Sequence, residues 1–202
     1  MTLFLDLYVT NQLRIFVTIR LPFKFFNGVA SSKFGLLTRE SDGYQIIFDR
    51  ILPHNALVVW EAITNPEKMK RWFLETEIEF KVGGKIVFKF GDPDDSESYG
   101  KITRIEQGEL FEYFWENAEG GPDELAKWEL FPEGKSKTRL RLTYSRLSEK
   151  YGSLASGGWH IMLDHLEEVL NGRTEPFPYT GGQSEEEKSV AAEYAKLILK
   201  LA

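Results

Sequence analysis

The chain has 202 residues, of which 42% are hydrophobic and 28% charged, and it contains no cysteine. This length supports a single domain with a full core, and the lack of cysteine excludes thiol catalysis, thiolate metal sites and disulfide scaffolds. The net charge of −6 argues against nucleic acid as a partner, because nucleic-acid-binding domains usually present a basic face. Together these properties favour a cytoplasmic domain without a cofactor.

Residues 1–39 differ in composition from the rest of the chain. They contain five Lys or Arg residues against one acid, Asp6, and are rich in Leu, Phe, Ile and Val. Charged residues interrupt the apolar runs before they reach the ~18 residues of a spanning helix, so we expect no stable membrane insertion. Three interpretations stay open: a transit-like or membrane-surface segment, a strand pair over 3–9 and 13–21, and a start codon assigned too far upstream. The last two are favoured.

The first regular elements are predicted between residues 44 and 73. Tyr44–Leu52 is apolar and β-branched, which indicates a strand. Helical spacing then predicts two short helices, separated at Asn65-Pro66, with Asn55 and Asn65 as their N-caps. Each helix carries a tryptophan on its apolar face, so we expect the pair to cover one end of a curved sheet.

Three hairpins are predicted next. Each consists of two runs of alternating apolar and polar residues around a glycine-containing turn, as expected for antiparallel strands with one buried face. In the first, Ile78, Phe80 and Val82 are the apolar positions before the turn. The hairpins span 78–90, 101–115 and 126–144, with turns at Gly83-Gly84, Gln107-Gly108 and Glu133-Gly134.

Two helices are predicted in the C-terminal part. The first runs over 154–170 with a continuous apolar face and ends at Asn171-Gly172. The second runs over 184–201, with Ser184 as its cap and acidic residues in its first turn. Its own apolar stripe indicates that it docks on the domain or on a partner.

Three motifs carry a family resemblance. They are V-W-E-A-I-T-N-P-E-K-M-K-R-W-F over 59–73, V-G-G over 82–84, and G-G-W-H-I-M-L-D-H-L over 157–166. Over 36–172 the chain resembles the activator of Hsp90 ATPase homologue-like domains of the START-like (SRPBCC, Bet v 1-like) superfamily. The resemblance implies an α+β helix-grip fold, in which a curved antiparallel sheet wraps around the long C-terminal helix. We expect an extension over 1–39, this domain over 40–174, and a linker with an amphipathic helix over 175–202.

The resemblance also implies a cavity between the long helix and the sheet. Aromatic residues make up 14% of the chain, and aromatic walls with a few polar tips suit an apolar ligand. The competing interpretation is that the same side chains fill the core. The predicted cavity-lining residues lie on the strands and helices expected to face inward: Trp60, Trp72, Phe88, Phe90, Tyr113, Trp115, Trp128, Tyr144, Trp159, Met162, Leu163 and Leu166.

Three hypotheses for the function stay open. The favoured hypothesis is non-enzymatic binding of a small hydrophobic molecule. The second is a co-chaperone or protein-interaction module, acting on a protein partner or as a homodimer. The eukaryotic activators carry a further domain ahead of this one, and 39 residues are too few to supply it. The third is a cyclase-like or hydrolase-like enzyme that would use His160, Asp164 and Tyr144, and it requires their polar tips to point into the cavity.

The sequence predicts neither a catalytic residue nor a metal site. His160 and Asp164 have the i, i+4 spacing of a pair on one helix, but no nucleophile elbow accompanies them. We therefore expect a local pair on a partly solvated face. His160 and His165 are five residues apart, unlike the i, i+4 ligand pair of a helical metal site, and the acidic run over 92–97 lacks the glycine and glutamate of a calcium loop.

Overall fold

The computed structural model describes residues 33–91, 96–117, 121–175 and 184–201. The strand pair predicted over 3–9 and 13–21 lies outside these residues, as do Asp92, Asp94 and Asp95 of the acidic run. None of the helices in the described ranges is long and apolar enough to cross a membrane.

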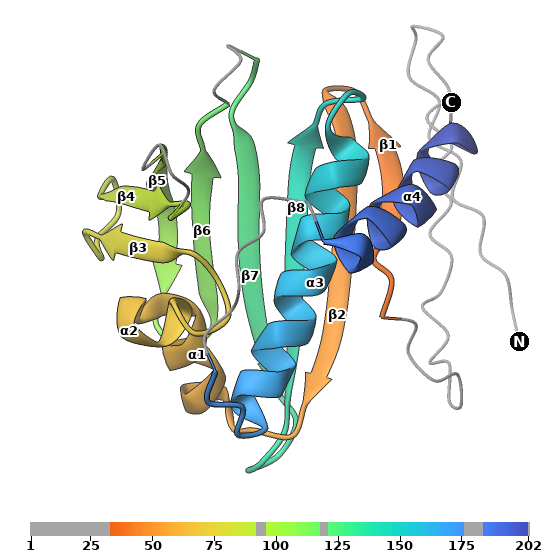
Figure 1. The fold of residues 1–202 in the computed structure, drawn as a ribbon. Helices are drawn as coiled ribbons and strands as arrows, with labels where there is room; N and C mark the ends of the chain where they lie inside the picture. The colour runs from red at the N-terminus through yellow and green to blue at the C-terminus, as the bar shows by residue number, and fades with distance from the viewer. Residues whose placement is uncertain (1–32, 92–95, 118–120, 176–183, 202) are drawn as a thin grey trace, which may run out of the picture. The chain divides into compact units, whose positions relative to one another are not determined.

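Eight strands form one antiparallel sheet in the order β1-β2-β8-β7-β6-β5-β4-β3 (Figure 1). Strands that follow one another along the chain pair with each other, except β2 and β3. β2 pairs with β8 instead. All of β1 except Glu40 falls in the residues assigned above to the extension, and β1 pairs with β2 along its whole length. The strands are β1 (Leu36–Glu40), β2 (Gly43–Leu52), β3 (Glu75–Ile78), β4 (Lys85–Lys89), β5 (Glu97–Glu106), β6 (Leu110–Trp115), β7 (Glu124–Pro132) and β8 (Thr138–Leu147).

Within the described ranges, four helices accompany the sheet: α1 (Ala56–Thr64), α2 (Pro66–Met69), α3 (Gly152–Leu170) and α4 (Glu185–Leu199). The predicted caps are present, since Asn55 accepts from the Val58 N–H and Asn65 from the Glu67 N–H. Ser184 and Glu187 form a reciprocal capping box at α4. α3 lies across one face of the sheet, α1 and α2 cover one end of it, and α4 crosses α3 (Figure 1). The helix-grip prediction is confirmed.

The first hairpin differs from its prediction. β3 ends at Ile78, and the side chains of Phe80 and Val82 are 42% and 64% exposed. The chain leaves the strand because residues 79–84 form a turn that also bonds to β5: the Gly83 N–H donates to the Ile102 carbonyl, and the Ile102 N–H to Gly84. A Cβ on Gly84 would lie 1.9 Å from the Glu79 carbonyl oxygen, so this tight turn requires glycine.

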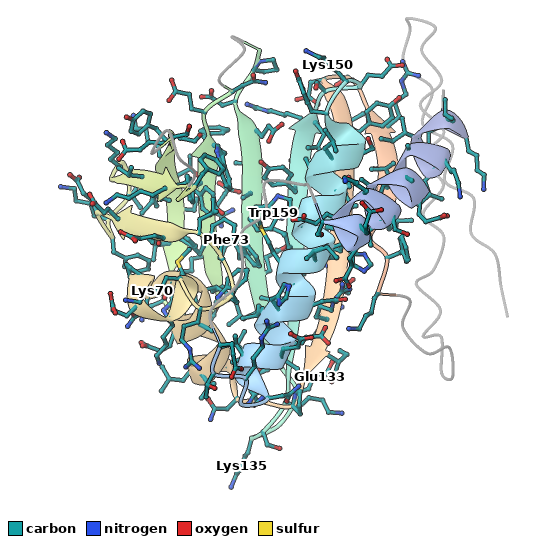
Figure 2. All side chains as sticks on the ribbon, in the orientation of Figure 1. Lys70, Phe73, Glu133, Lys135, Lys150 and Trp159 are labelled. Carbon is teal, nitrogen blue, oxygen red and sulfur yellow. The ribbon has the colours of Figure 1, made fainter. Side chains whose placement is uncertain are left out.

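The core lies between α1, α2 and α3 and the facing side of the sheet. Strand residues alternate between buried and partly exposed, most regularly along β2 and β8, as expected for a sheet with one covered face. Trp159 reaches from α3 across the sheet towards Phe73 (Figure 2), and their rings stack at 5.4 Å. This aromatic contact joins the long helix to the end covered by α1 and α2.

Candidate functional site

The twelve residues predicted to line a cavity separate into four that border a pocket, one that is partly buried and seven that lie in the core. Four of them border a pocket: Trp115, Tyr144, Trp159 and Met162. Phe90 is partly buried and packs against the core. The other seven lie fully inside the core, where they contact other side chains: Trp60, Trp72, Phe88, Tyr113, Trp128, Leu163 and Leu166. Most of the aromatic residues therefore fill the interior, and a smaller set borders open space.

The pocket has a volume of about 190 Å³ and lies between α3 and strands β6, β7 and β8. Its α3 wall consists of Ala155, Gly158, Trp159 and Met162, whose i, i+3, i+4, i+7 spacing places them on one side of the helix. The sheet wall consists of Trp115, Glu124 and Tyr144.

Glu124, Ala155 and Gly158 border the pocket but are not among the residues predicted from the sequence, and Glu124 is the only one of the three with a charged side chain. It opens β7 on the same face as Ala126 and Trp128, opposite Trp115 of β6. The strand predicted from the sequence begins at Ala126. Extending the alternation by two residues would have placed Glu124 on the inward face, so the signal was present in the pattern.

The Tyr144 hydroxyl donates a hydrogen bond to the Glu124 carboxylate. Tyr144 lies directly across from Ala126, whose small side chain leaves the diagonal path to Glu124 open. Burial raises the pKa of Glu124, and the hydrogen bond from Tyr144 offsets this only in part. Burial, together with the Glu124 charge, also raises the pKa of Tyr144 well above its ordinary value. The pocket therefore contains a carboxyl group that is protonated more easily than an exposed glutamate.

The two tryptophans of the pocket are held by their neighbours. Trp115 stacks on Phe88 with ring centroids 3.9 Å apart, and its indole N–H donates to Ser98 Oγ at 2.7 Å. Trp159 stacks on Phe73 and meets the Trp115 ring edge to face at 6.1 Å. Because both rings are fixed from behind, the walls have their shape before any ligand arrives.

Two adjacent glycines of α3 face different surroundings. A Cβ on Gly158 would meet no atom within 4 Å, whereas one on Gly157 would lie 3.1 Å from the backbone of Ala191 in α4. Gly157 thus permits the close approach of α3 and α4. Gly158 leaves space open at the pocket.

The prediction that His160 lies on a partly solvated face is wrong. The residue is only 5% exposed, because α4 and Phe34 cover it. Its Nδ1 is 3.0 Å from the Tyr194 hydroxyl, which accepts a hydrogen bond from the Gly35 N–H. Burial lowers the pKa of His160, although the Asp164 carboxylate at 3.7 Å acts in the opposite direction.

Asp164 also belongs to an ion-pair cluster around Arg50 of β2. Arg50 is buried and lies 3.4 Å from Asp164 and 2.9 Å from Glu167. Asp164 is therefore engaged by Arg50 as well as by His160. Neither His160 nor Asp164 borders the pocket that Tyr144 lines, so the three residues of the enzyme hypothesis are not brought together at one site.

A second hollow, of about 250 Å³, lies on the opposite side of the sheet. It is bordered by side chains that point away from α3, including Tyr99, Lys101, Phe114 and Glu116. Most of these side chains are exposed. Among the described residues, no group of three or more His, Asp or Glu side chains is placed to hold a metal ion.

Residues 53–171 match the family model described as activator of Hsp90 ATPase homolog 1-like protein. This match covers more than half of the chain. The chain belongs to this family. The matched range contains every residue of the pocket and the whole of α3. A comparison with the curated proteins finds no match.

Solved structures share the same fold. CalU16 from Micromonospora echinospora has a TM-score of 0.64 at 24% identity, over 83% of this chain and 96% of its own. EF2215 from Enterococcus faecalis, a conserved protein of unknown function, has a TM-score of 0.66 at 20% identity, over 83% and 92%. DynU16, from the dynemicin biosynthetic locus, has a TM-score of 0.56 at 20% identity, over 63% and 47%. At these identities the likeness shows the fold.

Proposed function

We propose that this member of the activator of Hsp90 ATPase homolog 1-like family binds a small, mainly apolar ligand without transforming it. The binding site is the pocket between α3 and strands β6 to β8. The ligand would lie on the open side of α3 and not in a large internal cavity, because side chains fill the aromatic core. We also propose a cytoplasmic location, which the absence of cysteine supports.

Gly158 carries this proposal. A glycine inside a helix destabilises it by about 1 kcal/mol relative to alanine, and here no neighbouring atom requires glycine, since a Cβ would meet nothing within 4 Å. The residue instead keeps space free at the α3 wall of the pocket. Open space kept against helix propensity supports a role in accommodating a ligand.

The size of the pocket limits the ligand. Sites for drug-sized molecules have volumes of roughly 300–1,000 Å³, whereas an apolar cavity of about 150 Å³ holds benzene. A pocket of about 190 Å³ therefore suits a molecule built around one ring. The side chains of Trp115, Trp159 and Met162 supply apolar contacts, and the carboxyl group of Glu124 supplies one polar end.

Native mass spectrometry of the protein, purified without detergent from its own host, tests this proposal. We expect a stoichiometric added mass that disappears on organic extraction. Gly158→Leu would place a side chain in the pocket, so the same purification of this variant should give the protein mass alone. An unliganded wild type, or an adduct retained in the variant, would contradict binding at this pocket.

Gly157→Ala serves as the matched control because it adds a side chain to the neighbouring position on the α4 side. Its Cβ would be directed at Ala191 and away from the pocket. We expect this variant to retain the adduct while losing some stability. Loss of the adduct in both variants would indicate a general effect on α3.

A further inference from the structure

The polar end of the pocket distinguishes it from a purely apolar site. Glu124 is partly buried among Trp115, Tyr144 and Trp159. Its one hydrogen-bond partner among the described residues is the neutral Tyr144 hydroxyl. Among the described residues, no cation acts on the pKa of Glu124, whose shift comes from burial and from the Tyr144 hydrogen bond. When ionised, Glu124 is therefore a carboxylate without a protein counter-charge.

A buried carboxylate without a cation is unfavourable unless a partner compensates it. Other acidic side chains of neighbouring strand positions do have cationic partners: Lys127 pairs with Glu129, and Arg141 with Asp49. Both of those pairs involve side chains that alternate to the other face of the sheet. On the pocket face, Glu124 borders the open volume of the pocket together with Trp115, Tyr144 and Trp159.

The rings around Glu124 would themselves favour a cation. Aromatic faces attract ammonium groups, most strongly where water is displaced. Trp115, Tyr144 and Trp159 surround the same space that the carboxylate faces. A carboxylate combined with aromatic walls is suited to a positively charged nitrogen attached to an apolar body.

Resting on the proposed function, we propose that the ligand of this pocket is a small organic ammonium ion, whose charged nitrogen pairs with Glu124 and whose apolar part lies against Trp115, Trp159 and Met162. This geometry selects against carboxylates, which would meet a like charge. It also selects against neutral ligands, which leave Glu124 uncompensated.

The raised pKa of Glu124 gives this proposal a signature in pH. An ammonium ion stabilises the ionised carboxyl, so its affinity should rise as pH increases through the pKa of Glu124, and binding should release a proton. The other titratable group facing Glu124 is Tyr144 of β8, whose pKa is raised and which stays neutral in this range. β6 contributes Trp115, and α3 contributes Ala155, Gly158, Trp159 and Met162, none of which titrates.

Three probes of similar size separate charge from shape: benzylammonium, benzyl alcohol and benzoate. We expect calorimetric titrations of the full chain at pH 7.5 to show that benzylammonium binds at least tenfold more tightly than benzyl alcohol. The reason is that only benzylammonium forms a charged hydrogen bond with Glu124. Benzoate should show no binding. Lowering the pH to 4.5, where a carboxyl with a raised pKa is mostly protonated, should weaken benzylammonium binding and leave benzyl alcohol unchanged.

Glu124→Gln tests the residue itself, because the amide keeps the shape and can still accept from Tyr144. It should lower the affinity for benzylammonium about tenfold with little change for benzyl alcohol. Asp123→Asn removes the same charge from the adjacent, exposed position and should keep the preference. Circular dichroism spectra and thermal midpoints would verify that both variants fold.

The outcomes separate the two proposals. If benzyl alcohol and benzylammonium bind wild type equally, or if the preference survives in Glu124→Gln, the ammonium assignment is wrong and the pocket remains a binding site. If the preference is lost equally in Asp123→Asn, the effect is one of overall charge, which also overturns it. If none of the probes binds, or if Gly158→Leu binds them as wild type does, the proposed function fails as well.

Discussion

The two sides of α3 show how one helix can be closed on one side and open on the other. On the α4 side, His160 and Gly157 are buried, and polar groups meet Tyr194 and Arg50 at hydrogen-bond or ion-pair distances. On the pocket side, Gly158 faces empty space, and Glu124 accepts a hydrogen bond from a hydroxyl but meets no cation from the part of the chain that the structure describes. The closed side is built for stability, whereas the open side leaves volume and charge for something else.

The largest expected effect lies on the closed side. Tyr194→Ala would remove a fully buried ring from α4, together with its contacts to Gly35 and His160. We expect a loss of about 3–5 kcal/mol in the free energy of unfolding, as for other buried aromatic truncations, measured by urea denaturation. Met162→Ala on the open side is the comparison and should lose clearly less, because Met162 is only partly buried. Equal losses would remove the distinction between the two sides.

The adjacent glycines give the next largest difference. Gly157→Leu would force a side chain against Ala191 and should destabilise the protein by about 1–3 kcal/mol, with α3 and α4 pushed apart. Gly158→Leu should leave stability unchanged or raise it by up to about 1 kcal/mol, since the helix loses a glycine. Thermal unfolding of the two variants measures this directly. A strongly destabilised Gly158→Leu would show that the pocket is closed in solution.

A smaller effect isolates the hydroxyl of Tyr194. Tyr194→Phe keeps the ring but leaves the Gly35 N–H and His160 Nδ1 without their partner. Leaving buried polar groups unpaired should lower the free energy of unfolding by about 1–3 kcal/mol. Tyr144→Phe is the matching change on the open side and should lower stability less, because Glu124 is only partly buried. Hydrogen exchange of the Gly35 amide should accelerate only in Tyr194→Phe.

The smallest effects concern pH, and the two sides should respond in opposite directions. The pKa of His160 is lowered in the fold, so its contribution to stability is present above the ordinary value of 6.5 and is lost as pH falls below it. The pKa of Glu124 is raised above its ordinary 4.5, so its contribution is present below that value and is lost as pH rises through the folded pKa.

Two variants separate the contributions of His160 and Glu124 to the pH dependence of stability. Relative to wild type, His160→Gln should weaken the loss of stability between pH 7 and pH 5, and Glu124→Gln should be the more stable protein at pH 8 but not at pH 4. Chemical denaturation at each pH gives both slopes. A wild-type slope left unchanged by either substitution would show that the corresponding group is not perturbed by its surroundings.

Local patterns made most of the fold predictable. The Asn55, Asn65 and Ser184 caps lie where the spacing placed them, and the turns containing Gly108 and Gly134 have the positive φ that favours glycine. The first hairpin was only partly predictable. Phe80 and Val82 continue an alternating pattern, but hydrogen bonds between the turn and β5 end the strand earlier, and such non-local bonds leave no mark on local periodicity.

The site was less predictable for a related reason. Periodicity places Trp128 and Trp159 on inward faces, but it does not tell which inward residues meet another side chain and which meet open space. His160 was assigned to a solvated side because its cover comes from α4, 34 residues further along the chain. Glu124 was passed over because the predicted strand began two residues too late. The His160 error concerns how distant elements meet, whereas the Glu124 error concerns where one strand begins.

A ligand that enters the open space at α3 should change the surroundings of the nearest of the five tryptophans of the chain. We would titrate the protein with benzyl alcohol and follow the indole N–H resonances by NMR. Those of Trp115 and Trp159 should shift saturably, those of Trp60 and Trp72 in the filled core should stay in place, and Gly158→Leu should abolish every shift. Saturable shifts that persist in Gly158→Leu, or no shift at Trp115 and Trp159, would contradict the account.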